Sequence, residues 1–189
     1  GVTQINILIG TIIASFQTGA VSYLYYADRV YQIILAIAGI AVGTVSLPIL
    51  SKAFKTNNVK KISDIQNKSF ELSLLFSIPA SFGLILASNE ITNALFGYGS
   101  FSQNDVEMTA AALKFFGYGV PAFALIKILS NFFFARDNTK TPFYISLFVV
   151  LLNILISVSF FNKIGFIIIP IATSISTWVG VFIYIYLLK

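Results

Sequence analysis

An acid and a guanidinium stand side by side, Asp28 and Arg29, just before an apolar stretch that covers residues 30–50. An arginine at the centre of a membrane helix costs about 2.5–3.5 kcal/mol on insertion scales, so an ionised group at membrane depth needs a chemical reason. Arginine stays charged at physiological pH, and its planar fork of donors matches a phosphate or diphosphate. We therefore expect Arg29 to bind an anionic group of a ligand.

Asp28 is expected to have a different role from Arg29, although both are candidate substrate-binding residues. Neighbouring residues on a helix point about 100° apart, so the two side chains cannot both face one ligand. A capping or orienting role is expected for Asp28. The alternative for Arg29 is a purely interfacial one, in which it reaches the outer headgroups or pairs with Asp28 or Glu90.

The composition is that of a membrane protein. Of the 189 residues, 57% are hydrophobic and only 10% are charged, whereas a soluble domain carries roughly a quarter charged residues. The apolar stretches are about as long as the ~20 residues that a helix needs to cross a bilayer. They are continuously apolar, unlike the alternating strands of a membrane barrel. The sequence therefore predicts an all-α, polytopic transmembrane helical bundle.

Several kinds of chemistry are unsupported by the residue types present. The chain contains no Cys and no His, which removes the usual zinc sites and Cys or His catalysis. There is no phosphate-binding glycine loop and no pair of acids within an apolar stretch, so we expect no enzyme, no cofactor and no metal centre. The net charge of +5 is interpreted as a signal of topology rather than of nucleic-acid binding.

Six apolar stretches are predicted to be membrane spans, at about residues 2–16, 23–50, 70–88, 106–135, 143–161 and 164–188. The positive-inside rule predicts that the lysine-rich stretch 51–69 and the short stretch 136–141 are cytoplasmic loops. Residues 89–105 contain no Lys or Arg and are predicted to form an outer loop. The chain starts at Gly1 and ends at Lys189 on the predicted inner side, and we expect it to be a fragment of a longer protein.

Rare polar groups and helix-breaking residues inside the apolar stretches are typical of proteins that move a solute or a lipid through the membrane. The predicted helix breaks are Pro79, Gly117, Gly119, Pro121 and Pro170.

Several motifs together resemble one known family. Residues 25–29 are Tyr-Tyr-Ala-Asp-Arg, residues 39–45 are Gly-Ile-Ala-Val-Gly-Thr-Val, and residues 47–48 are Leu-Pro. Residues 96–101, 133–137 and 140–142 add Phe-Gly-Tyr-Gly-Ser-Phe, Phe-Phe-Ala-Arg-Asp and Lys-Thr-Pro. With these motifs, essentially the whole chain resembles the MurJ (MviN) family of lipid II flippases.

The resemblance implies a fold and a function. Members have fourteen helices in two lobes around a central cavity, and this chain resembles helices seven to twelve. The implied function is movement of an undecaprenyl-diphosphate-linked peptidoglycan precursor, lipid II, across the bacterial inner membrane by alternating access. Arg29 matches a cavity arginine thought to engage the diphosphate. The implied partners are lipid II, membrane lipids and the N-terminal lobe of the same full-length protein, with no nucleic acid.

A cation site is also implied by the resemblance, but in reduced form. Some members are thought to bind sodium through carboxylates on helices seven, eleven and twelve. The matching positions here include Gly10 and Ser157, while Asn153 and Thr173 remain. Asn153, Ser157 and Thr173 are thus the possible remnant of a cation site. Weak binding is expected, because a cation needs several oxygen ligands and compensating charge.

Other functions stay open at this point. An ion-coupled antiporter of the same superfamily, exporting drugs or oligosaccharide-lipids, would need an intramembrane acid, and the spans offer only Asp28 near one end. A non-transporting scaffold or an inactive fragment is an alternative from a different class. A membrane prenyl or glycosyl transferase is less supported, because it would need an acidic metal-binding cluster.

Overall fold

The computed structural model describes the backbone of residues 2–188 and the side chains of residues 7–188. Gly1 and Lys189, with the expectations attached to them, lie outside the described residues. In chain order the elements are α1 (Val2–Ala14), α2 (Ala20–Leu35), the π-helical segment η1 (Ala36–Ala41), α3 (Val42–Lys55), α4 (Val59–Leu86), α5 (Ser88–Phe96), α6 (Gln103–Phe134), α7 (Lys140–Ile164), the 3-10 turn η2 (Gly165–Ile167) and α8 (Ile168–Leu188). Because every element within the described residues is helical, the all-α fold class is confirmed.

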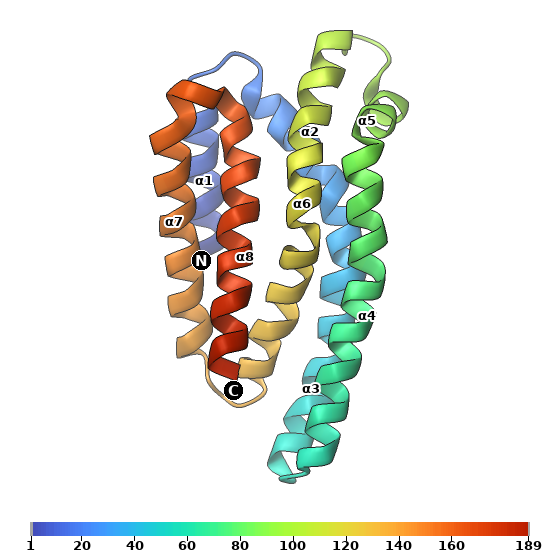
Figure 1. Cartoon of the computed structure of the whole chain (residues 1–189), viewed down its shortest axis with the longest axis vertical. Helices are drawn as coiled ribbons and strands as arrows, with labels where there is room; N and C mark the ends of the chain where they lie inside the picture. The colour runs from blue at the N-terminus through green and yellow to red at the C-terminus, as the bar shows by residue number, and fades with distance from the viewer. Residues whose placement is uncertain (1, 189) are drawn as a thin grey trace.

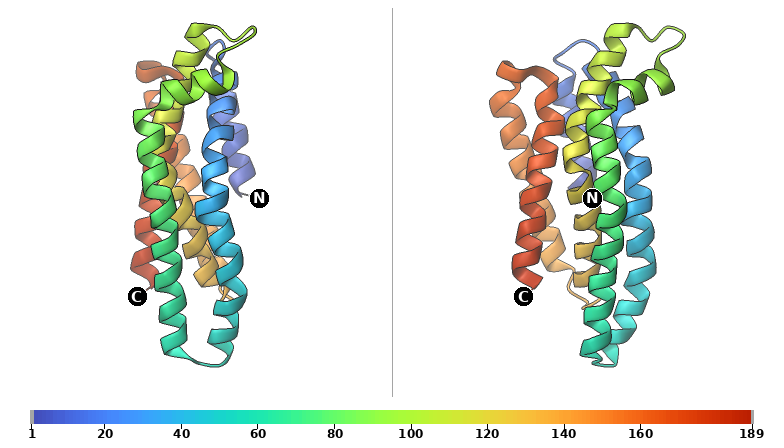
Figure 2. Two further views of the ribbon diagram at one scale, coloured as in Figure 1. Left: turned by 90° about the vertical axis from the view of Figure 1, so that its right-hand side faces the viewer. Right: turned by 45° about the vertical axis from the view of Figure 1, so that its right-hand side comes forward.

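Helix α6 is the centre of the bundle and contacts α2, α4, α5 and α8 (Figure 1). Of its most apolar stretch, 72% is buried inside the protein, against 22–28% for the other long apolar helical segments. Helices α7 and α8 pack side by side with α1 behind them, and α3 and α4 form the opposite side (Figures 1 and 2). The apolar surface left exposed on the outer helices suits a hydrocarbon environment.

Four helical segments among the described residues are long and apolar enough to cross a membrane, namely Ala20–Lys55, Val59–Leu86, Gln103–Phe134 and Lys140–Leu188. The last segment consists of α7 and α8, which turn back on one another at η2 (Figure 1). The chain is therefore a multi-pass membrane protein. Helix α1 has 13 residues, fewer than the ~20 that a span requires, so the expected first span stays a prediction.

The lysine-rich stretch 51–69 is not the loop that the sequence suggested. Helix α3 continues to Lys55, and α4 begins at Val59 after a short turn. The side chain of Asn58 caps α4 by accepting a hydrogen bond from the Lys61 backbone N–H at 3.0 Å. Lysine and glutamine are good helix formers, so charge alone does not end a helix. The two helices form a hairpin that projects beyond the rest of the bundle (Figures 1 and 2).

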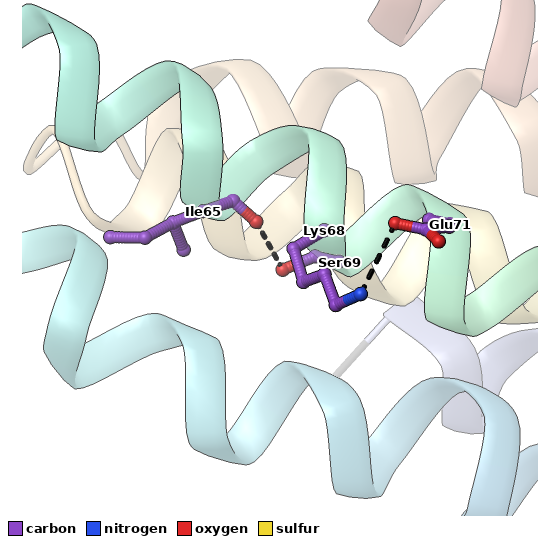
Figure 3. A network of polar contacts seen from close by, with 4 residues as sticks. All are labelled: Ile65, Lys68, Ser69 and Glu71. Atoms are coloured by element: carbon purple, nitrogen blue, oxygen red, sulfur yellow. Dashed lines mark hydrogen bonds and ion pairs between the residues drawn. The ribbon is translucent and has the colours of Figure 1, made fainter.

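The polar contacts of α4 in this region are local ones. Ser69 donates its hydroxyl to the Ile65 carbonyl at 2.7 Å, and Lys68 pairs with Glu71 at 3.3 Å, as Figure 3 shows. Both partners of the ion pair are exposed, where such pairs contribute little. The cytoplasmic location of the hairpin stays a prediction.

The expected outer loop, 89–105, is also partly helical, because α5 occupies its first half. Helix α6 then starts behind a capping box: the Ser102 hydroxyl accepts from the Asp105 N–H at 3.2 Å, and the Asp105 carboxylate accepts from the Ser102 N–H at 2.8 Å. This reciprocal pair satisfies two backbone donors at the helix start. It explains why α6 begins at Gln103, three residues earlier than its apolar run.

The predicted helix breaks do not interrupt their helices. Helix α4 stays α-helical through Pro79, α6 through Gly117, Gly119 and Pro121, and Pro170 lies in the first turn of α8. The prediction of breaks at these positions is therefore wrong for the helical backbone. The irregular element is instead η1, which joins α2 to α3.

Neighbouring helices explain how α6 tolerates its proline. Pro121 has no N–H, so the carbonyl of Gly117 lacks its usual helical donor. That carbonyl accepts a hydrogen bond from the Ser81 hydroxyl of α4 at 2.7 Å. From α8, Ser174 donates its hydroxyl to the Phe115 carbonyl at 2.8 Å. Trp178, also on α8, donates its indole N–H to the Tyr118 carbonyl at 3.0 Å. Polar groups from neighbouring helices are the usual compensation for such residues in membrane helices.

Candidate functional site

Arg29 lies on α2 with its side chain exposed. Its guanidinium carbon is 4.7 Å from the centre of the Tyr25 ring, one turn earlier on the same helix. The one ion pair among the described residues joins Lys68 to Glu71, so the expected alternative in which Arg29 pairs with Asp28 or Glu90 is not observed. Arg29 thus presents a positive charge that rests on an aromatic face and has no carboxylate partner in the described part of the chain.

Asp28 is half-buried and points elsewhere. One of its carboxylate oxygens accepts a hydrogen bond from the amide of Gln32, one turn later on α2. A capping role is wrong, because α2 begins at Ala20 and its N-cap residue is Gly19. Asp28 lines a pocket to which Arg29 does not contribute. The two neighbours therefore serve different surfaces of the helix, as helical geometry requires.

The pocket lies between α1, α2, α6, α7 and α8 and has a volume of about 190 Å³. Its polar lining comes from four residues far apart in the sequence: Thr11, Asp28, Asn153 and Thr173. Tyr25, which carries Arg29 on its ring, also lines it. The pocket therefore brings the Asp28 carboxylate next to part of the expected cation-site remnant.

The three remnant residues form a hydrogen-bonded chain between α7 and α8. Ser157 donates to the side-chain oxygen of Asn153 at 3.1 Å, and the Asn153 amide donates to the Thr173 hydroxyl at 3.0 Å. Thr173 in turn donates to the Ile169 carbonyl at 2.8 Å. Their polar atoms thus satisfy one another, and none of the three carries a charge. The set does not fit a sodium ion, which would need several free oxygens and a compensating negative charge.

The N-terminal half of α2 is held in place by contacts on two sides. The Tyr23 hydroxyl donates to the Asp105 carboxylate at the start of α6, at 3.0 Å. The Tyr26 ring packs against Phe96 and Phe101, with ring centres 4.9 and 5.3 Å away. These contacts fix the turns on which Asp28 and Arg29 stand.

The segment η1, which directly follows α2, packs closely on α6. A Cβ atom added to Gly39 would lie 3.1 Å from the Cα of Ala124, closer than ordinary van der Waals contact. Gly39 belongs to the π-helical segment η1, and such irregular turns occur frequently at functional sites. The spacing of Gly39 and Gly43 is one that permits close helix packing, but no local pattern reports the extra residue that makes a π-helix.

Sequence reasoning missed the aromatic part of the pocket lining. Tyr31 and Phe116 line the pocket, and their ring centres are 4.7 Å apart. For Tyr31 a signal existed, because a residue three positions after Asp28 lies on the same helix face. Phe116 comes from another helix, and no local pattern could place it.

A family model described as "Lipid II flippase MurJ" matches residues 1–189. Among curated proteins, the chain is 42% identical over 178 residues to a "Probable lipid II flippase MurJ" of Rickettsia prowazekii (strain Madrid E), covering 94% of this chain and 35% of that protein. It is 39% identical over 180 residues to a "Probable lipid II flippase MurJ" of Rhizobium tropici, with 95% and 34% covered. The chain thus spans about a third of the length of these curated relatives.

The chain also superposes on solved structures of transporters. The structure titled "Lipid II flippase MurJ, inward closed conformation" superposes with a TM-score of 0.91 at 32% identity, covering 100% of this chain and 40% of that one. An outward-facing multidrug resistance MATE family transporter superposes with a TM-score of 0.87 at 15% identity, covering 99% of this chain and 41% of that one. At that identity the second match shows a shared fold alone.

Proposed function

The chain belongs to the lipid II flippase MurJ family, and from this premise we propose that it forms part of a lipid II flippase. In this proposal it supplies helices seven to twelve of a fourteen-helix transporter. The full protein moves an undecaprenyl-diphosphate-linked peptidoglycan precursor across the bacterial inner membrane by alternating access. Its partners are the N-terminal lobe of the same protein, the precursor and the surrounding membrane lipids.

The observation that carries the proposal is the free guanidinium of Arg29. It stands on a helical segment long and apolar enough to cross a membrane, and it is exposed rather than paired with an acid among the described residues. An unpaired arginine at membrane depth is costly and is typically functional. A diphosphate offers the oxygen pairs that a planar guanidinium binds with two parallel hydrogen bonds.

The surrounding contacts suit this role. The Tyr25 ring under the guanidinium limits the positions that Arg29 can take, so less conformational freedom is lost when the anion binds. In the proposed mechanism Arg29 holds the diphosphate while the two lobes rock against one another. Because α4 and α6 stay helical through their prolines and glycines, the motion is proposed to be a rigid-body one in this part of the protein.

The test is complementation in a bacterium depleted of its own lipid II flippase. The full-length protein is supplied with Arg29 intact, as Arg29→Lys or as Arg29→Ala, at equal membrane abundance, and lysis is followed. The matched control is Arg136→Ala, because Arg136 also rests on an aromatic ring, that of Phe54, at 5.0 Å, but outside the site. We expect the intact protein and the control to prevent lysis, Arg29→Ala to fail and Arg29→Lys to be weakened.

The other outcomes separate the alternatives. Rescue by Arg29→Ala would make Arg29 an interfacial anchor and contradict the diphosphate role. Failure of the intact protein despite good insertion would contradict the flippase function itself and favour the antiporter or scaffold alternatives. Full activity of Arg29→Lys would count against two-point binding of the diphosphate, since lysine offers a single ammonium.

A further inference from the structure

The carboxylate of Asp28 is partly buried, with the charge of the neighbouring Arg29 near it but no direct ion pair between the two described side chains. It accepts a hydrogen bond from Gln32, but within the described residues it forms no ion pair. Removing a carboxylate from water without an opposite charge is expensive. A positively charged ligand in the pocket would offset this cost.

The other walls of the pocket next to Asp28 are mostly apolar, and three of the residues that line it are aromatic. These are Tyr25, Tyr31 and Phe116. Tyr31 is held between Phe116 and Phe123, with ring centres 4.7 and 5.2 Å away, so its ring is fixed before any ligand arrives. Aromatic faces attract cations, and organic ammonium groups are the cations that such walls bind best, because they bring apolar surface as well as charge.

A bare metal ion suits this pocket less well. A metal ion would need several oxygen ligands to replace its water. The polar atoms of Asn153 and Thr173 are already hydrogen-bonded to each other and to other groups of α7 and α8. In the part of the chain that the structure describes, no group of three or more acidic, His or Cys residues is close enough together to hold a metal. One carboxylate in a mostly apolar pocket with three aromatic residues fits an organic ammonium group instead.

The size of the pocket limits the ligand. Its volume of about 190 Å³ lies below the roughly 300–1,000 Å³ of sites for drug-sized molecules. Gly10 keeps one side open, because a Cβ atom there would have its nearest neighbour, an Ile169 methyl group, 3.8 Å away. The space therefore suits a small amine, or the ammonium group of a larger molecule.

We propose that the pocket between α1, α2, α6, α7 and α8 binds an organic ammonium group, with Asp28 as its counter-ion and Tyr25, Tyr31 and Phe116 as its walls. Two sources share this chemistry, a free small amine and the ethanolamine headgroup of a phospholipid. The proposal does not depend on the flippase function, because it rests on the pocket alone.

The experiment measures binding of n-butylammonium to the full-length protein in nanodiscs of phosphatidylglycerol, which carries no amine. Ligand-observed NMR or calorimetry gives the dissociation constant. We expect Asp28→Asn to weaken binding by about tenfold or more, the loss for one partly buried ion pair. The matched control is Asp64→Asn, which removes an exposed acid of α4 outside the pocket, and it should leave the constant unchanged.

Further comparisons test whether the binding is specific for an ammonium group. n-Butanol, which has the same chain without the charge, should bind much more weakly, and sodium at equal concentration should not compete. Phe116→Leu should lower the affinity a few-fold, because it removes an aromatic face of the pocket without touching the hydrogen bond between Tyr31 and Asp28. Gly10→Leu, which fills the space without changing any charge, should abolish binding and covers the case in which Asp28→Asn fails to fold.

Three results would contradict the proposed ammonium site. Equal binding of n-butanol would show that the pocket is only an apolar cavity, and competition by sodium would show a metal site. Unchanged binding in Asp28→Asn would show that Asp28 is not the counter-ion. Any of these overturns the proposal. Adding phosphatidylethanolamine to the nanodiscs then separates the sources: competition with n-butylammonium identifies the lipid headgroup as the ligand, and its absence identifies a free amine.

Discussion

The Ser81 hydroxyl in α4 donates a 2.7 Å hydrogen bond to the Gly117 carbonyl in α6. This carbonyl is the one that Pro121 leaves without a helical donor. The serine is buried, with 7% of its surface exposed, and a Cβ atom at Gly117 would come within 3.2 Å of the Leu84 side chain. The serine, the glycine and the proline thus form one arrangement in which close packing and hydrogen bonding compensate for a missing backbone donor.

Ser81→Ala should destabilise the protein by about 1 kcal/mol, because an interhelical hydrogen bond is lost and a buried carbonyl loses its donor. The matched control is Ser77→Ala, one turn earlier on α4. Ser77 is fully buried, and its hydroxyl has no hydrogen-bond partner among the described residues. Unfolding of the full-length protein in detergent should therefore show a loss for Ser81→Ala and none for Ser77→Ala. Equal effects would mean that burial, not the hydrogen bond, matters here.

Tyr25→Leu should reduce lipid II transport by a few-fold, because the guanidinium of Arg29 loses the ring on which it rests. A cation–π contact at an exposed site contributes about 0.5–1 kcal/mol. Tyr25→Phe keeps the ring and should keep transport. The measurement is the initial rate of lipid II translocation in proteoliposomes, together with membrane insertion of each variant. If Tyr25→Phe were as slow as Tyr25→Leu, the hydroxyl rather than the ring would be the functional part.

Gly39→Ala should destabilise the protein, because its methyl group would meet the backbone of Ala124 at 3.1 Å and a Leu35 methyl group at the same distance. The backbone of α6 cannot move aside as a flexible side chain could, so we expect a loss of about 1–3 kcal/mol, typical of overpacking. Gly83→Ala is the matched control on α4, since nothing lies within 4 Å of its added carbon. There the change should be neutral or stabilising by up to about 1 kcal/mol. Thermal unfolding of both variants tests the difference.

The sequence was sufficient for the helical fold because long apolar stretches have few alternatives in a membrane. Helix ends were harder to predict: the lysine-rich residues 51–69 have the composition of a loop, yet lysine is a good helix former, and α3 and α4 cover all of them except a short turn. Pro121 was expected to break α6, but its compensation comes from Ser81, forty residues earlier in the chain. Such compensation is tertiary, and no local pattern reports it.

The same distinction applies to the candidate site. The charge pair Asp28 and Arg29 was visible in the sequence because ionised groups are rare in apolar stretches. The pocket was not visible, because its lining joins Asp28 to Phe116 and Asn153 across three helices. The hydrogen bonds that occupy Asn153 and Thr173 likewise depend on how α7 meets α8. Residue types can therefore indicate chemistry here, while the packing decides which groups are free to perform it.

The chain of hydrogen bonds through Ser157, Asn153 and Thr173 should make the protein indifferent to sodium. Its polar atoms already satisfy one another, and a ligand stabilises a protein only if it binds the folded state. The melting temperature of the full-length protein should therefore be the same in sodium, potassium and choline chloride at equal ionic strength.

Ser157→Asp adds a negative charge to this hydrogen-bonded chain, beside the Asn153 oxygen. It should introduce a stabilisation by sodium of about 1–3 kcal/mol at saturating salt, as linkage predicts for a site filled well above its dissociation constant. Ser159→Asp, on an exposed position two residues later, is the control for added charge alone and should show no sodium effect. A higher melting temperature of the unmodified protein in sodium than in potassium would instead show that these residues open to coordinate the ion, and that their hydrogen bonds are only the ion-free arrangement.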